Sequence, residues 1–195
     1  IMGFADILIK LGVPYDSKKA LQLAEKVMKF VTDEDTKMSV EIGKKRGAFP
    51  NFAESSWEKQ GYKTTRNATV TTVAPTGTIS IIAGCSSGIE PIFAVAYVRN
   101  VMEDTQLLEV QPTFEKLAKD RGFYSKELMH KVAKTGSIQE LKEVPKDVRR
   151  LLVTSLDISQ RWHVQMQAAF QKYIELIPDD PNPYDSYAEL LMKMG

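Results

Sequence analysis

Residues 70–93 read VTTVAPTGTISIIAGCSSGIEPIF, and the interpretation of the whole chain depends on this stretch. It begins with β-branched residues, passes through Ala-Pro-Thr-Gly-Thr, and ends in small residues that include the chain's single cysteine. β-Branched residues favour strands, and proline is excluded from the middle of a sheet. The pattern therefore predicts a strand at 68–73, then a sharp turn, then a helix that starts near Thr78.

A junction of this kind can bind an anion, because the first amides of a helix have no intrahelical partners and lie at the positive end of its dipole. Gly77 has no Cβ, so a ligand can approach the backbone closely there. The hydroxyls of Thr76, Thr78 and Ser80 can donate to phosphate oxygens. The segment lacks the GxxxxGK[ST] and GxGxxG patterns, so it predicts a phosphate cradle without a lysine. On spacing alone, the commoner alternative is that Thr76 or Thr78 only caps the helix.

Two other residues of the stretch invite a chemical interpretation. Cys85 lies among glycines and serines, and the chain's two histidines, His130 and His163, are distant in sequence. We therefore expect Cys85 to be a packing residue rather than a nucleophile, and no metal-ligand spacing is present. Glu90 either pairs with a cation such as Arg99 or faces a site, and the ion pair is the favoured hypothesis.

The rest of the chain is mostly helical by its apolar period, with glycine and proline as stop signals. Residues 48–65 are expected to form a loop with one helical turn, and residues 94–101 a second strand. A Pro- and Asp-rich change of composition after residue 176 separates a main segment, 1–176, from a divergent linker and short helix at 177–195. The helices are expected at 1–11, from Ser17 to before Gly47, and at 112–121, 125–134, 145–153 and 159–174.

Composition limits the class of protein. The chain has 195 residues, 43% of them hydrophobic, 26% charged, and a formal net charge of +1, which is typical of a globular protein without a nucleic-acid or membrane partner. The first ten residues lack a basic leader, so we do not interpret them as a signal peptide. A single cysteine cannot form an internal disulfide, which fits the cytoplasm. The first residue is Ile, which suggests a piece of something longer.

The run RNATVTTVAPTGTISIIAGCSSGIEPIFAVAYVRNV closely resembles the adenosylcobalamin-dependent (class II) ribonucleotide reductases, in the C-terminal half of their catalytic subunit. MGFADILIKLGVPYDS upstream and DISQRWHVQMQAAFQKY downstream extend the resemblance over about residues 1–173. The resemblance implies a ten-stranded α/β barrel in the whole enzyme. This chain would supply a partial, helix-rich α/β segment of it.

The resemblance also implies a role for the loop Pro75-Thr76-Gly77-Thr78-Ile79-Ser80, which in this family holds the diphosphate of the ribonucleotide. The side chains of Thr76, Thr78 and Ser80 and the amides of Gly77 and Ile79 would contact the phosphates. The family converts ribonucleotides to deoxyribonucleotides, an oxidoreductase reaction of deoxyribonucleotide biosynthesis and DNA replication. Adenosylcobalamin generates a radical on a finger-loop cysteine, and a cysteine pair reduces the ribose.

The chain departs from the family because the finger-loop cysteine and the reducing pair are absent from it, and because its sequence diverges after Tyr173. We therefore expect no catalytic residue and no metal ligand in this chain, and no cofactor bound to it alone; whether it is an enzyme stays open. Its expected partners are the ribonucleotide, the missing N-terminal portion of the reductase, and a second copy of itself through exposed apolar faces. The alternative hypothesis is a helical binding or regulatory protein that has lost the reaction.

Overall fold

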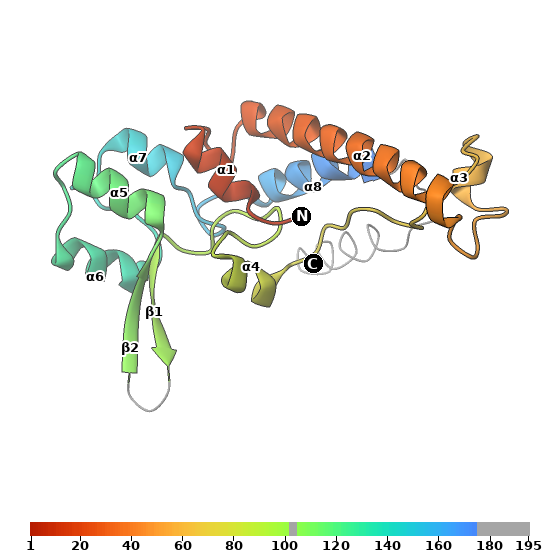
Figure 1. The fold of residues 1–195 in the computed structure, drawn as a ribbon. Helices are drawn as coiled ribbons and strands as arrows, with labels where there is room; N and C mark the ends of the chain where they lie inside the picture. The colour runs from red at the N-terminus through yellow and green to blue at the C-terminus, as the bar shows by residue number, and fades with distance from the viewer. Residues whose placement is uncertain (102–104, 175–195) are drawn as a thin grey trace. The chain divides into compact units, whose positions relative to one another are not determined.

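The computed structural model describes residues 1–101 and 105–174, so the predicted linker and helix at 177–195 lie outside the described residues. The chain divides into two compact units, which we describe separately. Unit 1 contains Leu21–Ala74, the chain from His163 onward, and Ile1, whereas unit 2 contains Met2–Ala20 and Pro75–Trp162. Figure 1 labels their helices and strands.

The predicted helices are confirmed. Ser125 begins one of them as its N-cap, where its side chain accepts a hydrogen bond from the amide of Leu128 at 3.0 Å, and Gly136 ends it in a left-handed conformation. The single turn expected within 48–65 is also present. The helices are α1 (Phe4–Lys10), α2 (Lys18–Arg46), α3 (Ser56–Lys59), α4 (Gly77–Ala83), α5 (Pro112–Asp120), α6 (Lys126–Thr135), α7 (Lys146–Leu151) and α8 (Gln160–Ile174).

In unit 1, residues 64–67 pack along the second half of α2. The carbonyl oxygen of Ser39 accepts from the amide of Arg66 at 2.9 Å. The hydroxyl of Ser39 accepts from the amide of Asn67 at 3.0 Å and lies 3.2 Å from its side-chain oxygen. A Cβ on Gly43 would lie 2.8 Å from the hydroxyl oxygen of Thr64, so α2 needs a glycine at this position.

The predicted strand at 68–73 is wrong, because the structure assigns no strand to these residues. A strand requires a neighbouring strand whose backbone forms hydrogen bonds with its amides and carbonyls. Within the described residues there are two strands, described below, and they pair only with each other. The backbone of 68–73 finds other partners. The carbonyl of Ala68 accepts from the indole of Trp57 at 2.7 Å, and that of Thr72 accepts from the N-terminal amine of Ile1 at 2.8 Å.

Unit 2 carries an antiparallel hairpin of β1 (Ala96–Val101) and β2 (Thr105–Val110), in a register that pairs Ala96 with Val110. β1 confirms the strand predicted at 94–101. β2 was not predicted, because its leucines at positions 107 and 108 are adjacent and both exposed, so the alternation that marks a half-buried strand is missing. Helix α6 contacts both strands.

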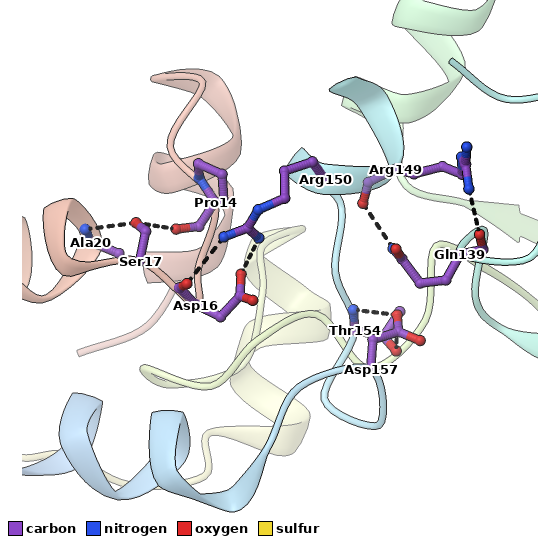
Figure 2. Close-up of polar contacts among 9 residues, drawn as sticks. All are labelled: Pro14, Asp16, Ser17, Ala20, Gln139, Arg149, Arg150, Thr154 and Asp157. Atoms are coloured by element: carbon purple, nitrogen blue, oxygen red, sulfur yellow. Dashed lines mark hydrogen bonds and ion pairs between the residues drawn. The ribbon is translucent and has the colours of Figure 1, made fainter. Parts of the chain in front are cut away.

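A second β contact in unit 2 is an isolated parallel bridge between Ile92 and Thr154. The amide of Ser155 donates to the carbonyl of Ile92 at 3.0 Å. Figure 2 shows how Thr154 is held: its amide and its hydroxyl both donate to the carboxylate of Asp157, each at 2.8 Å. The unit is therefore a helix-rich α/β structure with parallel and antiparallel β contacts.

Polar contacts also join distant segments of unit 2 (Figure 2). The guanidinium of Arg150 in α7 pairs with the carboxylate of Asp16 and donates to its backbone carbonyl at 3.1 Å. Gln139 and Arg149 exchange two hydrogen bonds between side chain and backbone, both of 2.8 Å. The apolar core of unit 2 has among its fully buried members Phe4, Leu8, Val95, Phe114, Met129, Val132, Ile138, Val144 and Leu152.

Candidate functional site

The predicted phosphate segment, residues 75–80, lies at the start of α4 in unit 2 (Figure 1). Thr76 occupies the N-cap position with φ 51° and ψ 29°, one of two non-glycine residues with positive φ among the described residues. This left-handed conformation is costly for a β-branched residue and persists only where its surroundings enforce it. The turn before α4 is therefore a constrained feature of the fold.

The first amides of α4 belong to exposed residues and precede the hydrogen bonds of the helix. The first hydrogen bond of the helix runs from the amide of Ser80 to the carbonyl of Thr76 at 2.9 Å, so the amides of Gly77, Thr78 and Ile79 come before the helical ladder. The side chain of Thr76 does not cap them. A Cβ on Gly77 would meet no other atom within 4 Å, and Thr78 and Ile79 are exposed. The simple capping alternative is thus not what Thr76 does.

Two of the three predicted hydroxyls are engaged within the protein. The hydroxyl oxygen of Thr76 accepts a hydrogen bond from the amide of Gly88 at 2.7 Å. The hydroxyl of Ser80 donates to the carbonyl of Gly77 at 3.1 Å and lies 3.0 Å from the hydroxyl of Ser87. Ser80 is only 1% exposed. The structure brings the six predicted residues together, but the side chain of Ser80 faces the interior.

The loop that follows α4 is attached to α1. The amide of Ser86 donates to the carboxylate of Asp6 at 2.6 Å, and the hydroxyl of Ser86 accepts from the amide of Asp6 at 3.3 Å. The side-chain amide of Gln111 donates to the other oxygen of Asp6 at 3.3 Å. Sequence reasoning missed Asp6, Ser87 and Gly88 as supports of this region, because nothing in local spacing shows contacts between segments so far apart.

Cys85 lies half-buried in this loop, where its amide donates to the carbonyl of Ser80 at 3.0 Å. A Cβ on Gly3 would lie 3.5 Å from the Cβ of Cys85, so the thiol side chain packs beside the start of α1. Its role as a packing residue stays a prediction. Within residues 1–101 and 105–174, no group of histidine, cysteine and carboxylate side chains could hold a metal ion.

The favoured pairing of Glu90 with Arg99 is wrong. Arg99 instead pairs across the hairpin with Glu109, at 3.6 Å between the guanidinium and the carboxylate. The two residues are diagonal neighbours on one side of the ribbon, because Arg99 is paired with Leu107 and Glu109 with Tyr97. Glu90 is exposed and lies on the wall of a cavity of about 360 Å³, together with Ser80, Cys85 and both members of the Arg99–Glu109 pair. The alternative, that Glu90 faces a site, is therefore the one that this geometry favours.

Behind Glu90, the phenol of Tyr15 is buried and donates to the carbonyl of Ile89 at 2.7 Å. Burial, and to a smaller extent the charge of Glu90, raise the pKa of Tyr15 above its ordinary value near 10. The phenol is therefore a neutral donor that holds the backbone before Glu90.

Unit 1 has a separate cavity of about 430 Å³ between α2 and the residues around α3. Its walls include the hydroxyl-bearing Thr32 and Thr36 and the aromatic rings of Trp57 and Tyr62, whose centroids are 5.1 Å apart. None of the residues predicted for phosphate binding contributes to this cavity.

No helix of the described part of the chain has both the length and the apolar character needed to cross a bilayer.

Comparisons with known proteins agree on one family. The family model described as "Ribonucleotide reductase, barrel domain" matches residues 1–176. The vitamin B12-dependent ribonucleoside-diphosphate reductase of Thermoplasma acidophilum is 53% identical over 175 residues, which are 90% of this chain and 22% of that protein. A protein of the same name from Mycobacterium tuberculosis is 44% identical, with 90% and 25% covered.

A solved structure shows the same similarity. The class Id ribonucleotide reductase alpha subunit of Actinobacillus ureae matches with a TM-score of 0.70 and 26% identity, over 88% of this chain and 30% of that chain. The present chain thus spans about a quarter of the length of the curated relatives described above.

Proposed function

Since the chain belongs to the ribonucleotide reductase barrel-domain family, we propose that it is the portion of a ribonucleotide reductase that binds the diphosphate of the substrate. The resemblance to the vitamin B12-dependent members is confirmed by the identities of 53% and 44%. The helix-rich α/β fold, with few strands, is that of a partial barrel. The proposed site is the segment Pro75, Thr76, Gly77, Thr78, Ile79 and Ser80 at the start of α4. Within it, Thr76, Gly77, Thr78 and Ile79 would contact the phosphates, and the buried Ser80 would support them.

The observation that carries the proposal is the set of amides at Gly77, Thr78 and Ile79. They precede the hydrogen-bond ladder of α4, their residues are exposed, and Gly77 has no side chain to keep a ligand from the backbone. The hydroxyl of Thr78 is exposed beside them and can donate to a phosphate oxygen. The hydroxyl of Thr76 accepts from Gly88 and still has its proton to donate. The names of the relatives, ribonucleoside-diphosphate reductases, support a diphosphate as the ligand.

The complete protein would convert ribonucleotides to deoxyribonucleotides by radical chemistry with adenosylcobalamin, as the family resemblance implies. The names of the relatives, vitamin B12-dependent ribonucleoside-diphosphate reductases, support the reduction and the cofactor. The residues of this chain do not fit the radical step. Its one thiol, Cys85, is half-buried and packs beside Gly3. We therefore assign the chain no step of that chemistry and no contact with the cofactor, and we propose that the chain alone is inactive. The single cysteine favours the cytoplasm as the place of action.

Binding of inorganic diphosphate to the chain, measured by isothermal titration calorimetry, tests the cradle directly. We expect Gly77→Ala to weaken binding by about tenfold or more, because a methyl group at this position would stand between the amides and the ligand. The fold has room for that methyl group, so the thermal stability should not fall. Thr78→Val, which removes only the hydroxyl, should weaken binding less. Equal affinity of Gly77→Ala and the unchanged chain would overturn the site.

Complementation tests the partner and the activity. The chain alone should reduce no ribonucleotide with adenosylcobalamin and a thiol. Addition of the N-terminal portion of a B12-dependent reductase should restore turnover, and Gly77→Ala should lower it. A folded and associated pair without turnover would instead favour a binding or regulatory protein that has lost the reaction.

A further inference from the structure

Ser80 cannot serve the proposed cradle as a direct phosphate donor. A serine hydroxyl has one proton and two lone pairs. The hydroxyl of Ser80 gives its proton to the carbonyl of Gly77, at 3.1 Å, so the hydroxyl of Ser87, 3.0 Å away, donates to it in turn. Ser80 borders the cavity that Glu90 lines, but it is only 1% exposed, so its hydroxyl offers almost no surface to a ligand. Ser80 can therefore affect ligand binding only through the residues that its hydroxyl contacts.

Those neighbours belong to the loop after α4, which is joined to the cradle by two hydrogen bonds, here called the two ties. Ser87 bonds to Ser80 at the end of the first helical turn, and the amide of Gly88 donates to the hydroxyl of Thr76 at 2.7 Å before that turn. The exposed amides of residues 77–79 lie between the two ties. The second tie also holds the side chain of Thr76, whose backbone is in the costly left-handed conformation.

The loop after α4 is itself held by hydrogen bonds to other segments, so it can restrict the position of the cradle residues. The amide of Cys85 donates to the carbonyl of Ser80 at 3.0 Å, and Ser86 exchanges two hydrogen bonds with Asp6 at the start of α1. Donors that are fixed before the ligand arrives bind it more tightly, because less ordering remains to be done on binding.

We propose that Ser80 and Ser87 are positioning residues for the diphosphate cradle: their hydroxyl pair couples the loop after α4 to the amides of residues 77–79. The identity of the ligand in this inference rests on the proposed function. The coupling between the loop and the amides rests only on the hydrogen bonds described above.

The experiment measures inorganic diphosphate binding to the chain for Ser80→Ala, Ser87→Ala, Ser87→Thr and the double alanine variant. Each alanine variant should bind about three- to tenfold more weakly, the effect of one neutral hydrogen bond. Ser87→Thr keeps the hydroxyl and should retain affinity. Ser137→Ala is the matched control, since Ser137 also donates to a side chain of unit 2, the carboxylate of Asp157 at 2.7 Å, away from the cradle. It should lower stability without changing affinity.

The double variant separates positioning from direct contact. If the two serines act through one shared bond, the double variant loses no more affinity than either single variant. A Ser80→Ala loss that persists undiminished in the Ser87→Ala background would show that Ser80 acts independently of Ser87, and it would overturn the inference. Unchanged affinity in both single variants would also overturn it.

A ligand-free measurement distinguishes failure of this inference from failure of the proposed function. Ser87→Ala should shift the amide NMR signals of Gly77, Thr78 and Ile79, whereas Ser137→Ala should not. If the unchanged chain binds no diphosphate, the proposed function fails and these signals still decide the coupling. If Ser87→Ala leaves the signals in place, the coupling is wrong whatever the ligand result.

Discussion

At the scale of the residue, Tyr15 shows how one buried polar group supports the neighbourhood of the site. Its phenol donates at 2.7 Å to the carbonyl of Ile89, the residue before Glu90, and both partners are buried. A buried carbonyl without a donor costs free energy. The carbonyl next to Glu90 therefore depends for its hydrogen bond on a residue that lies far from it in sequence.

We predict that Tyr15→Phe lowers the free energy of unfolding at neutral pH by about 0.5–1.5 kcal/mol, because the carbonyl of Ile89 loses its donor. A second effect appears at alkaline pH, because the pKa of Tyr15 is higher in the folded state than its ordinary value near 10 in the unfolded chain. Below pH 10 the phenol is neutral in both states and the contribution of Tyr15 to the free energy of unfolding is complete. Above pH 10 the phenol ionises in the unfolded chain first, so this contribution is lost as the pH rises. Urea unfolding between pH 7 and 11 should show an alkaline loss that is smaller in Tyr15→Phe.

Tyr97→Phe is the control for this prediction, because Tyr97 is exposed on β1. It should match the unchanged chain in stability and in alkaline dependence. A Tyr15→Phe chain with unchanged stability at pH 7 and the same alkaline loss would contradict the role assigned to the buried phenol.

Single residues also show what the sequence could and could not predict about the site. The glycine and hydroxyls of residues 75–80 were predictable, because helix-end geometry makes local demands on residue type. Which of these residues are exposed and which are buried was not predictable. That Ser80 is buried and Thr78 exposed depends on Ser87 and Gly88, whose return to α4 is a contact of the folded chain.

At the scale of the element, α2 carries the most demanding close approach, at Gly43. A Cβ there would lie 2.8 Å from the hydroxyl oxygen of Thr64 and 3.1 Å from the backbone of both Thr65 and Arg66. Backbone atoms cannot move aside as a flexible side chain can. The packing of α2 on the extended chain therefore depends on this one residue having no side chain.

We predict that Gly43→Ala lowers the free energy of unfolding by about 1–3 kcal/mol, the usual cost of overpacking, despite the better helix propensity of alanine. Gly77→Ala is the control, since its methyl group would meet no atom within 4 Å and should not destabilise the chain. Urea denaturation of the two variants measures the difference. Two variants of equal stability would contradict the close approach.

Elements differ in how well sequence predicts them, for a physical reason. The helices contain their own hydrogen bonds, so the apolar period and the glycine stops were enough to place α5, α6 and α8 to within a residue or two. A strand needs a partner from elsewhere. Residues 68–73 have the composition of a strand but no pairing neighbour among the described residues, whereas β2 pairs with β1 despite a weak strand pattern.

At the scale of the whole molecule, the chain covers only 22% and 25% of two of its relatives. Two large apolar side chains are exposed: Ile82 in α4 is 80% exposed and Phe93 is 77% exposed. Exposed large apolar side chains occur at interaction surfaces. The partner that we propose for this surface is the missing portion of the reductase or, in its absence, a second copy of the chain.

We predict that the chain self-associates at high micromolar concentration and that Ile82→Gln with Phe93→Gln shifts it toward the monomer, measured by sedimentation equilibrium. Leu156→Gln is the control, because Leu156 is 86% exposed but is not part of α4 or the segment after it. A strictly monomeric mass for the unchanged chain would contradict the prediction. So would an equal shift in the control.

The parallel bridge between Ile92 and Thr154 has a consequence for the order of folding. The hairpin and helices α5, α6 and α7 lie between these residues in the chain, and bringing such distant segments together costs more entropy than forming a local helix. In a pulsed hydrogen-exchange refolding experiment, the amide of Ser155, which donates to Ile92, should gain protection after the amides of α5 and α6. Simultaneous protection would indicate a single concerted step. A late bridge would make the closing of unit 2, rather than the formation of its helices, the event that limits its rate of folding.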